Sequence, residues 1–324
     1  MKEKNKIGCA VIGLGWWGQQ MIQKIKKTNK FNILTVFDSD KNKTHSTAMK
    51  LNCLGVDDFQ KILVNSQIKV VFIFSPNQYH KEQIVAAAKA GKKIFVEKPL
   101  ANTSSECAEI LKACRKNKTL LAVGHNVRRY SIFRKAKKMV NSGVLGDLIL
   151  IDGNRSRPIG YRIDKNNWRY YRTSCNGGPL IQMGIHIIDT IRFVCGFEGK
   201  SFMTLCQKKF LTTENPETFS SIFELDNGCL VHLVSSYVLQ ETFYINFFGT
   251  KGSLFVDPFN GLFIQKHSGL NRKEIDYVAE DAENKELNDF YWAIMKGKKF
   301  EPEAYEAMQN VKIVENIIKQ IKDY

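Results

Sequence analysis

The feature that most constrains this chain is a glycine-rich turn between a short apolar run and a helical stretch. Residues 7–12 form an apolar run broken only by small residues, which is typical of a strand buried on both faces. Gly13-Leu14-Gly15-Trp16-Trp17-Gly18 follows, and residues 19–27 have a helical pattern. This order predicts the first strand, turn and helix of a parallel sheet.

The same alternation continues through the first 120 residues. Strands that alternate with helices of ordinary length favour right-handed crossovers and a parallel sheet covered on both faces. We therefore expect an α/β fold of the doubly wound Rossmann type over residues 1–123. Its further predicted strands are residues 31–37, 70–74, 94–96 and 120–123, and its further predicted helices are residues 83–90 and 104–116.

The pattern changes after residue 124, where a helix, a strand and a long helix lead into a run of strands that follow one another directly. Hairpin turn sequences such as Asp226-Asn227-Gly228 separate some of these strands and favour an antiparallel meander. We predict that residues 124–324 form an α+β domain on an open-faced, mainly antiparallel sheet, and the pattern leaves open whether the C-terminal helices pack on the first domain. The predicted helices are 132–142, 179–194, 281–295 and 303–322, and the predicted strands are 148–154, 202–208, 218–225, 229–238, 242–248, 253–257 and 262–266.

Composition excludes several classes of protein. The 44% apolar and 25% charged content is that of a soluble globular protein, and the longest apolar runs fall far short of the roughly 20 residues that span a bilayer. Eight scattered cysteines form no C-x-x-C pair and no Cys/His cluster at zinc spacing, so we expect reduced thiols, a cytoplasmic location and no metal site. The net charge of +16 comes mostly from single, solvated lysines, which argues against a nucleic-acid or membrane partner.

The G-x-G-x-x-G spacing of the turn gains meaning from Asp38, which ends the second predicted strand. Gly13 permits a tight turn, Gly15 lets backbone amides approach a diphosphate, and Gly18 lets the helix pack close to the strand. The helix N-terminus adds partial positive charge for the phosphates. These residues, with Trp16 and Trp17 between the glycines, predict a dinucleotide site; the alternative is an ordinary strand-to-helix turn.

The carboxylate of Asp38 also bears on which dinucleotide binds. It would accept hydrogen bonds from the adenosine ribose hydroxyls and would repel the 2'-phosphate of NADP. We therefore expect NAD as the cofactor. Lys41 and Lys43 lie nearby in the sequence and leave NADP open as the alternative.

Two further segments follow strands of the predicted parallel sheet. They are Ser75-Pro76-Asn77-Gln78-Tyr79-His80 and Val96-Glu97-Lys98-Pro99-Leu100. Ligands of such sheets bind beyond the carboxyl ends of the strands. We expect cofactor contacts from Ser75, Pro76, Asn77, His80, Glu97 and Lys98, although Asn77 and His80 could instead cap turns.

Together with the glycine turn, these segments resemble the glucose-fructose oxidoreductase, inositol dehydrogenase and MocA (Gfo/Idh/MocA) family of NAD(P)-dependent enzymes. The resemblance runs almost the whole length, through the E-K-P sequence at residues 97–99 and Gly177-Gly178 to the Gly184-x-His186-x-x-Asp189 pattern. It implies that Lys98 is the catalytic lysine and that the Lys98–Pro99 bond is cis. It also implies an open-faced second sheet used for oligomerisation, hence a homo-dimer or homo-tetramer.

The chemistry of Lys98 agrees with that role. Oxidation of a secondary alcohol requires a base for the hydroxyl proton while hydride leaves for the nicotinamide. A lysine pKa of about 10.4 is too high for a base at neutral pH, so burial and the positive ring would have to lower it by roughly three units, about 4 kcal/mol. The alternative is a surface lysine before a turn proline.

Gln182 and His186 are four residues apart on the predicted helix and so share one face. In the family's usual pattern an aspartate stands where this chain has Gln182. A glutamine can hydrogen-bond a hydroxyl but cannot accept its proton. We therefore expect Lys98 to carry the proton and His186 to be a hydrogen-bond partner or relay, unless His186 is a core residue. Asp189 could either serve the site or pair with Arg192 at i+3.

Arginines gather before and along this helix, since nine of the eleven lie between Arg128 and Arg192, interleaved with aromatic residues. Guanidinium groups bind carboxylates and phosphates and stack on aromatic rings. This predicts an acidic substrate such as a sugar acid or sugar nucleotide, and the alternative is a set of structural ion pairs. The predicted substrate-binding residues are Arg128, Arg157, Trp168, Arg169, Gln182 and His186.

The sequence thus predicts an NAD(P)-dependent oxidoreductase that acts on a secondary alcohol or ketone of a cyclic polyol, a sugar or an acidic sugar derivative. Lys98, His186 and Gln182 are its predicted catalytic residues. One alternative is a non-catalytic NAD-binding sensor or scaffold, which Gln182 favours. Another is a nucleic-acid-binding protein, whose binding would weaken steeply with salt.

Overall fold

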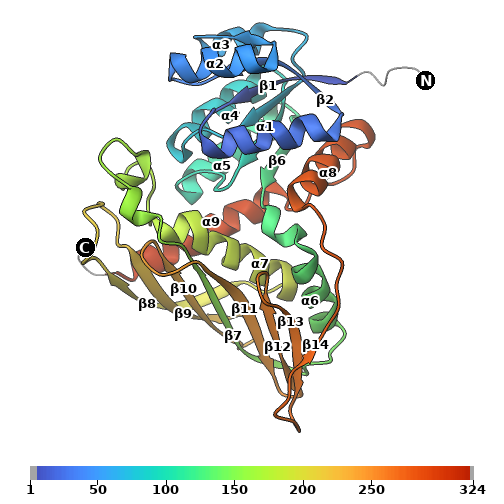
Figure 1. Ribbon diagram of the computed structural model, residues 1–324, viewed down its shortest axis with the longest axis vertical. Coiled ribbons are helices and arrows are strands. Elements are labelled where there is room, and N and C mark those ends of the chain that lie inside the picture. Colours follow the sequence, from blue (N-terminus) through green and yellow to red (C-terminus); the bar gives the residue numbers. More distant parts are fainter. Residues whose placement is uncertain (1–5, 322–324) are drawn as a thin grey trace. The chain divides into compact units, whose positions relative to one another are not determined.

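The computed structural model describes residues 6–321 and divides the chain into two compact units (Figure 1). The first unit comprises the chain up to Gly124 together with Glu283–Met308. The second comprises His125–Ala282 together with the residues from Gln309 onward. No helix within residues 6–321 combines the length and apolar character needed to cross a membrane.

The first unit contains a six-stranded sheet with the order β3-β2-β1-β4-β5-β6, in which all neighbouring strands run parallel. This is the strand order of a Rossmann fold, so the predicted fold class is confirmed. The strands are β1 (Ile7–Ile12), β2 (Phe31–Phe37), β3 (Leu54–Gly55), β4 (Val70–Ile73), β5 (Lys93–Glu97) and β6 (Leu121–Gly124). The helices before residue 125 are α1 (Trp16–Thr28), α2 (Lys41–Leu51), α3 (Phe59–Val64), α4 (His80–Lys89) and α5 (Ser104–Lys116).

Three of these elements, α2, β3 and α3, were not predicted from the sequence. Helix α2 buries Thr44, Thr47 and Ala48, so it has no strong apolar stripe for a periodicity argument to detect. Its start is nevertheless marked by Asp40, whose side chain accepts hydrogen bonds from the backbone N–H groups of residues 42 and 43. The capping residue Asp40 thus marks the start of this helix in the sequence, whereas the hydrophobic pattern does not.

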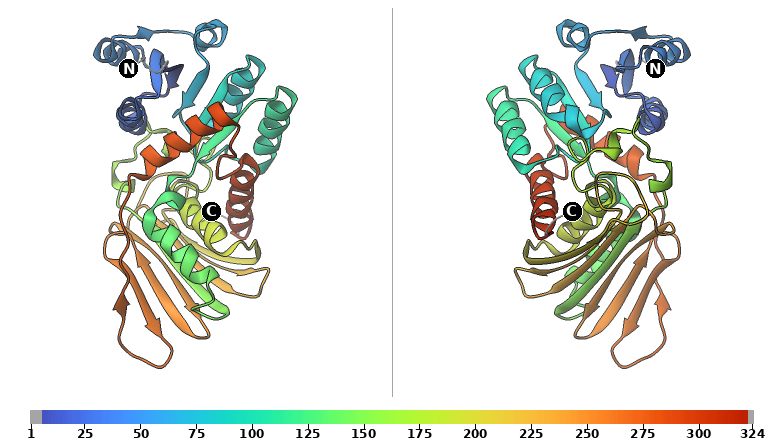
Figure 2. Two further views of the ribbon diagram at one scale, coloured as in Figure 1. Left: turned by 90° about the vertical axis from the view of Figure 1, so that its right-hand side faces the viewer. Right: turned by 90° about the vertical axis from the view of Figure 1, so that its left-hand side faces the viewer.

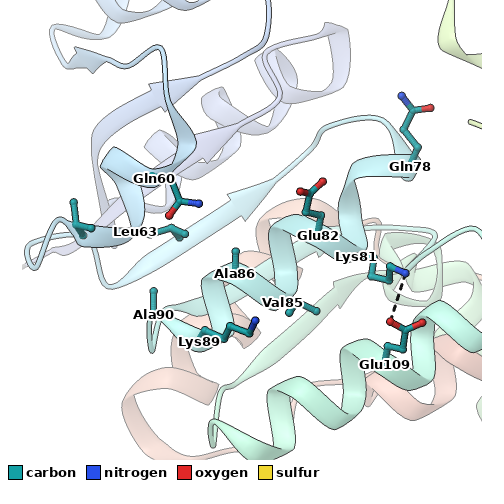
Figure 3. A pocket seen from close by; sticks show the side chains of 11 residues that line it. Gln60, Leu63, Gln78, Lys81, Glu82, Val85, Ala86, Lys89, Ala90 and Glu109 are labelled. Carbon is teal, nitrogen blue, oxygen red and sulfur yellow. Dashed lines mark ion pairs between the residues drawn. The ribbon is translucent and has the colours of Figure 1, made fainter.

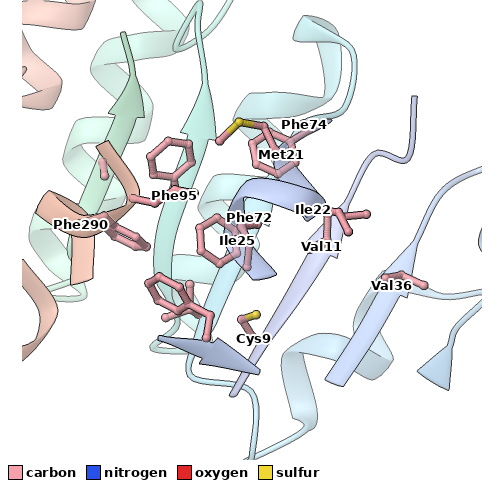
Figure 4. Packing of buried hydrophobic residues seen from close by; sticks show 14 of the residues in the cluster. Cys9, Val11, Met21, Ile22, Ile25, Val36, Phe72, Phe74, Phe95 and Phe290 are labelled. Atoms are coloured by element: carbon pink, nitrogen blue, oxygen red, sulfur yellow. The ribbon is translucent and has the colours of Figure 1, made fainter. Parts of the chain in front are cut away.

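The core of the first unit includes an aromatic side chain from near the C-terminus. Phe72 and Phe95 lie on adjacent central strands with ring centroids 5.7 Å apart. Phe290, on helix α8 (Ala282–Lys296), lies 5.5 Å from Phe95 and 5.9 Å from Phe72 (Figure 4). The segment after residue 282 therefore completes the packing of a sheet built by the first 124 residues.

The second unit contains an eight-stranded sheet with the order β14-β13-β12-β11-β7-β10-β9-β8. Most of its neighbouring strands are antiparallel, as predicted. The strands are β7 (Leu148–Ser156), β8 (Gly199–Gln207), β9 (Thr218–Leu225), β10 (Leu230–Ser236), β11 (Thr242–Gly249), β12 (Gly252–Asp257), β13 (Gly261–Lys266) and β14 (Lys273–Glu274).

The predicted simple meander is wrong at the centre of this sheet. Strand β7 lies between β10 and β11, and it pairs parallel with β10 and antiparallel with β11. Strands β10 and β11 are therefore consecutive in the chain but not neighbours in the sheet. Alternating hydrophobicity reports which face of a strand is buried, and it carries no information on which strand lies beside it.

Helices α6 (Ser131–Asn141) and α7 (Ile185–Cys195) lie on one face of this sheet (Figure 2). At Gly153 of β7, a Cβ atom would lie 2.7 Å from Cγ2 of Ile187, so only glycine allows α7 to pack this close. The opposite face carries exposed Met203 and Leu205, and also a hydrogen-bonded chain of side chains from three adjacent strands. In this row of side chains, His232 of β10 contacts Asp152 of β7 at 2.9 Å and Ser220 of β9 at 3.1 Å. Helix α9 (Ala304–Lys319) ends the described chain.

Candidate active site

The glycine turn of the first unit is as tight as the spacing predicts. Gly13 has φ of 86°, and a Cβ atom there would collide with the backbone of Phe74 and Ser75 at the end of β4. A Cβ atom at Gly18 would collide with the carbonyl oxygen of Gly13. The two outer glycines are therefore required by the approach of β4 and of α1 to the turn.

The middle glycine differs, because a Cβ atom at Gly15 would meet nothing within 4 Å. Gly15 is the N-cap residue of α1, where no side chain caps the helix and no acidic residue lies in the first turn. Helix N-terminal N–H groups without a side-chain partner, next to open space, suit a phosphate group. This arrangement fits the diphosphate of a dinucleotide.

Asp38 directly follows β2 and lies beside the glycine turn. Its Oδ2 accepts a hydrogen bond from the backbone N–H of Leu14 at 2.7 Å, and its Oδ1 accepts one from Asp40 at 2.9 Å. Oδ1 also accepts from the hydroxyl of Ser39 at 3.5 Å, so it is Oδ2 that retains a lone pair for a hydroxyl donor. The carboxylate is thus fixed in direction before any ligand binds.

The segment after β4 is held by its own side chains. Ser75 donates a hydrogen bond to Gln83 at 2.6 Å. Asn77, in a short 3₁₀ turn (Asn77–Tyr79), is 4% exposed, and its amide donates to Oδ1 of Asn102 at 3.3 Å. These contacts connect the β4 loop to α4 and to the segment before α5. The cofactor contacts of Ser75, Pro76 and Asn77 stay predictions.

His80 connects the two strand-end segments. It is 1% exposed, with Nδ1 2.8 Å from the carbonyl oxygen of Pro99 and Nε2 2.9 Å from that of Ser75. Burial lowers the pKa of His80 even though both carbonyl groups favour the charged ring. A neutral ring has one N–H and donates to only one of these carbonyls at a time. His80 therefore positions the turn after Lys98, and its predicted contact with the cofactor stays a prediction.

The E-K-P segment ends β5, and the Lys98–Pro99 bond is cis, as the family resemblance implied. The indole Nε1 of Trp17 donates a hydrogen bond to Oε2 of Glu97 at 2.8 Å. Burial raises the pKa of Glu97 to about 7, although the charge of Lys98 and the indole hydrogen bond act in the opposite direction. The structure thus brings Trp17 of the glycine turn to the residue before Lys98, a contact that the sequence pattern did not predict.

In the second unit, the predicted helix over residues 179–194 begins with a π-helical turn. Residues Leu180–Gly184 form this turn, in which the N–H of Ile185 donates to the carbonyl of Leu180, and regular α7 follows. The hydroxyl of Ser235 contacts the carbonyl oxygen of Pro179 at 2.8 Å and so holds the start of the turn against β10. Single π-turns inside helices frequently mark functional sites.

Gln182 lies in the π-turn and is 9% exposed. Nε of Arg169 donates a hydrogen bond to its Oε1 at 3.3 Å, and the Arg169 guanidinium lies 4.4 Å from the ring centroid of Trp168. Across residues 6–321, no carboxylate pairs with Arg169. The structure therefore brings three predicted substrate-binding residues together. His186 follows in the first turn of α7 and is partly exposed.

Arg128 has a structural use. It is 1% exposed, and its Nε and Nη2 donate to the two carboxylate oxygens of Asp189 at 2.9 and 2.6 Å. Burial by itself would raise the pKa of Asp189, but the charge of Arg128, with hydrogen bonds from Arg128 and Asn310, outweighs it and lowers the pKa to about 2. Asp189 does not pair with Arg192, which instead contacts Glu198 at 2.6 Å. Substrate binding by Arg128 stays a prediction.

Other members of the arginine cluster also form ion pairs. Arg157 lies 3.1 Å from Glu241, and Arg155 lies 3.6 Å from the same carboxylate oxygen. Burial, followed by the charge of Arg157, lowers the pKa of Arg155. Structural ion pairing, the alternative to an acidic substrate, thus accounts for part of the cluster and not for Arg169.

Comparison with known proteins agrees with this geometry. The family model described as "Oxidoreductase family, NAD-binding Rossmann fold" matches residues 7–125, and that of the GFO/IDH/MocA C-terminal domain matches residues 133–255. This chain belongs to the Gfo/Idh/MocA oxidoreductase family. Membership confirms both the resemblance seen in the sequence and the enzyme class, an NAD(P)-dependent oxidoreductase.

Individual Gfo/Idh/MocA relatives act on sugars. The 2,7-anhydro-N-acetylneuraminate hydratase of Mediterraneibacter gnavus is 25% identical over 267 residues, covering 78% of this chain and 67% of that protein. The D-glucoside 3-dehydrogenase of Escherichia coli is 28% identical over 281 residues, covering 78% of both. A levoglucosan dehydrogenase solved with NADH and levoglucosan shares the fold, with a TM-score of 0.87 at 20% identity over 98% of this chain and 97% of that one.

A surface hollow of the first unit is lined by other residues. It measures about 780 Å³ and lies between α3 and α4, with an ion pair of 3.5 Å between Lys81 and Glu109 at one side (Figure 3). Val64, Val85 and Ala86 contribute to its apolar lining. It contains none of the predicted site residues of this Gfo/Idh/MocA chain.

Within residues 6–321 no cluster of His, Cys, Asp and Glu side chains has the geometry of a metal site.

Proposed function

We propose that this chain is a dehydrogenase that transfers a hydride between NAD and a secondary alcohol or ketone of a cyclic polyol, a sugar or an acidic sugar derivative. The observation that carries the proposal is the glycine turn, where open space at Gly15 meets the uncapped N-terminus of α1 and the fixed carboxylate of Asp38. When bound, the nicotinamide supplies the hydride acceptor or donor.

In this proposal Lys98 exchanges the proton of the substrate hydroxyl. It follows β5 directly, at the strand end where ligands of such sheets bind. His186 and Gln182 of the second unit position the reacting oxygen. Because the amide of Gln182 does not ionise, no carboxylate at that position competes with Lys98 for the proton.

We propose NAD rather than NADP on the charges around Asp38. A 2'-phosphate beside this carboxylate would meet a like charge. Lys41 and Lys43 are the nearby lysines that could offset it, and Nζ of Lys43 lies 3.4 Å from the carboxylate of Asp40. An exposed ion pair of this kind is weak, but it directs the lysine toward its own helix cap.

The acidic class of substrate is favoured by the cluster of Trp168, Arg169 and Gln182. In this cluster the guanidinium of Arg169 is next to a neutral amide where the family's usual residue is an aspartate, so its positive charge is not compensated. A guanidinium held against an aromatic ring and an amide suits a carboxylate. The relative from Mediterraneibacter gnavus is named for a neuraminate, which is a sugar acid.

Replacement of Arg169 by Met tests this substrate class. The variant should raise KM for sugar acids about 10- to 100-fold and leave KM for neutral sugars nearly unchanged, because it removes one charged contact. Arg162→Gln, a change at an exposed arginine of the same segment, is the matched control. An equal rise of KM for acidic and neutral sugars would show that Arg169 only supports the fold.

The name of that relative also supports a second candidate, a redox-neutral hydration or dehydration of a sugar acid. The decisive assay incubates the protein with NAD and a panel of polyols, sugars, sugar acids and sugar nucleotides. It follows both NADH absorbance and the substrate NMR spectrum, since a hydratase changes only the second. Lys98→Ala should abolish turnover and retain NADH binding. Dinucleotide binding without turnover of any compound would favour the sensor or scaffold.

We also propose that the chain is a homo-oligomer that uses the open face of the second sheet. Met203, Leu205 and Ile222 are apolar residues exposed on β8 and β9, and a face of this kind is typical of an interaction surface. Leu205→Glu should reduce the mass measured by light scattering toward that of a monomer. An unchanged mass would place the interface elsewhere.

A further inference from the structure

A single hydrogen bond joins the glycine turn to the residue before Lys98. Trp17 is the second residue of α1, and Glu97 is the last residue of β5. The 2.8 Å contact between the Trp17 indole and the Glu97 carboxyl spans 80 positions in the sequence. An indole N–H donates only, so this contact favours the ionised carboxylate over the protonated one.

Glu97 is partly buried, and its carboxyl group lies close to the backbone of β6. Gly124 lies opposite Glu97 in the pairing of β5 with β6. A Cβ atom there would lie 3.1 Å from Oε2 of Glu97 and 3.2 Å from the ring of Phe95. The carboxyl group therefore lies between the indole of Trp17 and the backbone of Gly124.

Two charged side chains act on the protonation of this carboxyl in opposite directions. Lys98 favours its ionised form, and Glu283 on α8, which lies 3.3 Å from Lys24, favours its protonated form. His80, whose own pKa is affected by Lys98, is a further titratable group at these strand ends. With burial, the balance of these effects raises the pKa of Glu97 to about 7, where small changes in its surroundings alter its protonation at neutral pH.

We propose that the Trp17 indole and the Glu97 carboxyl form a hydrogen-bonded switch through which dinucleotide binding at the glycine turn is linked to proton uptake beside Lys98. The inference rests on the proposed function, because it requires a dinucleotide at this turn. Glu97 acts as a positioning residue, since the proton it gains changes the charge next to the amine of Lys98.

Two effects of binding act in the same direction. The negative charges of the diphosphate, placed at the N-terminus of α1, favour the protonated form of a nearby carboxyl. Any movement of Trp17 away from Glu97 removes the donor that stabilises the ionised form. Glu97 therefore takes up a proton as the turn is filled, and the dinucleotide binds more tightly at pH values below the pKa of Glu97 than above it.

Calorimetric titration with NADH, in two buffers of different ionisation enthalpy and between pH 6 and pH 8.5, tests the switch. In the wild-type protein a fraction of a proton should be taken up near pH 7, and the Kd for NADH should rise with pH by at most tenfold per pH unit. ADP-ribose, which has the diphosphate and no nicotinamide, should show the same uptake. Glu97→Gln should bind NADH with no uptake at Glu97 and a nearly constant Kd.

Two tryptophan variants separate the switch from a general effect on the fold. Trp17→Phe removes the donor and should move the midpoint of the pH dependence upward, and circular dichroism and the melting temperature should verify that it folds. Trp292→Phe, a change on α8 of the same unit, should keep the wild-type pH dependence.

The outcomes distinguish this inference from the function on which it rests. NADH binding with the same pH dependence in wild type and Glu97→Gln would overturn the switch and assign the linkage to another group such as His80. A wild-type Kd that does not change with pH, or uptake with NADH and not with ADP-ribose, would also overturn it. Failure of the wild type to bind either compound at any pH would instead overturn the dinucleotide function itself.

Discussion

The glycine turn of the first unit and the Trp168–Arg169–Gln182 cluster of the second are built by different means. The turn is shaped by the backbone, because Gly13 and Gly18 exclude side chains and Asp38 is held by two backbone N–H groups. In the cluster, one side chain contacts another, as Arg169 does with Trp168 and Gln182. A site shaped by backbone tolerates few substitutions, whereas a site shaped by side chains changes its chemistry with one residue.

Within the second unit, the arginines also differ in whether their charge is buried or exposed. Arg128 and Asp189 are sealed in the protein interior, while Arg169 remains partly exposed and without a carboxylate partner in the part of the chain that the structure describes. Arg128 and Asp189 therefore compensate each other's charge inside the protein, whereas substrate binding by Arg169 stays a proposal. The arginine cluster read from the sequence therefore contains two functional kinds of residue that spacing alone does not separate.

The largest effect should come from breaking the buried pair of Arg128 and Asp189. Asp189→Asn leaves Arg128 buried without a counter-charge, and the free energy of unfolding at pH 7 should fall by about 3 to 5 kcal/mol. Because the folded pKa of Asp189 is lowered from 3.8 to about 2, the stabilisation is complete above pH 3.8 and disappears as the pH falls toward 2. Urea denaturation at pH 7 and pH 3 measures both, and a variant as stable as the wild type at pH 7 would contradict the assignment.

A smaller loss should follow from adding a methyl group to the turn. Gly18→Ala places a Cβ atom against the Gly13 carbonyl, and overpacking of this kind costs about 1 to 3 kcal/mol. Gly15→Ala is the matched control, since its Cβ atom meets nothing within 4 Å, so this variant should keep the wild-type stability and lose NADH affinity only. Thermal denaturation and NADH fluorescence titration separate the two results. Equal destabilisation by both changes would contradict the contrast between the glycines.

Asp38→Asn changes a charge and keeps an oxygen that can accept from the N–H of Leu14. Removal of the negative charge should tighten NADPH binding and weaken NADH binding, with the ratio of the two Kd values shifting about tenfold, or about 1.4 kcal/mol. Parallel titrations with NADH and NADPH measure the ratio. An unchanged ratio would mean that the ribose end of the dinucleotide does not lie beside Asp38.

The smallest effect should be the pH dependence of stability due to Glu97. Its folded pKa of about 7 lies above the ordinary 4.5, so its protonated form stabilises the fold fully below pH 4.5, and this contribution is lost as the pH rises through 7. In the wild type, ionisation of Glu97 should lower the melting temperature by about 2 to 4 °C between pH 5 and pH 7.5. In Glu97→Gln this decrease should be absent. The same decrease in the variant would assign it to other groups.

Much of the first unit was predictable because its strands are short, apolar and separated by readable turns. The glycine spacing and Asp38 located the turn, and helix 104–116 was predicted with the same bounds that α5 has. Helix α2 was missed because it buries threonines and alanine, and only its Asp40 cap marked it. Local signals therefore located the elements wherever an apolar pattern existed.

What the sequence did not predict depends on contacts between distant residues. The insertion of β7 between β10 and β11 leaves no trace in either strand, since all three alternate in the same way. The residue before the π-turn, Pro179, accepts a hydrogen bond from the hydroxyl of Ser235, 56 positions away in the sequence. Two further contacts also join residues that are far apart in the sequence, so only the structure shows them. They are the hydrogen bond of Trp17 to Glu97 and the buried pair of Arg128 and Asp189.

The place of Phe290 in the core of the first unit has a consequence for the order in which this protein can fold. During synthesis the six strands emerge first, and Phe72 and Phe95 then lack one of the rings that later cover them. The ribosome must add more than 160 further residues, about those from 125 to 290, before that ring is available. The core of the nucleotide-binding sheet therefore stays incomplete while the other unit is translated. During this time its aromatic side chains are exposed to chaperones and to aggregation.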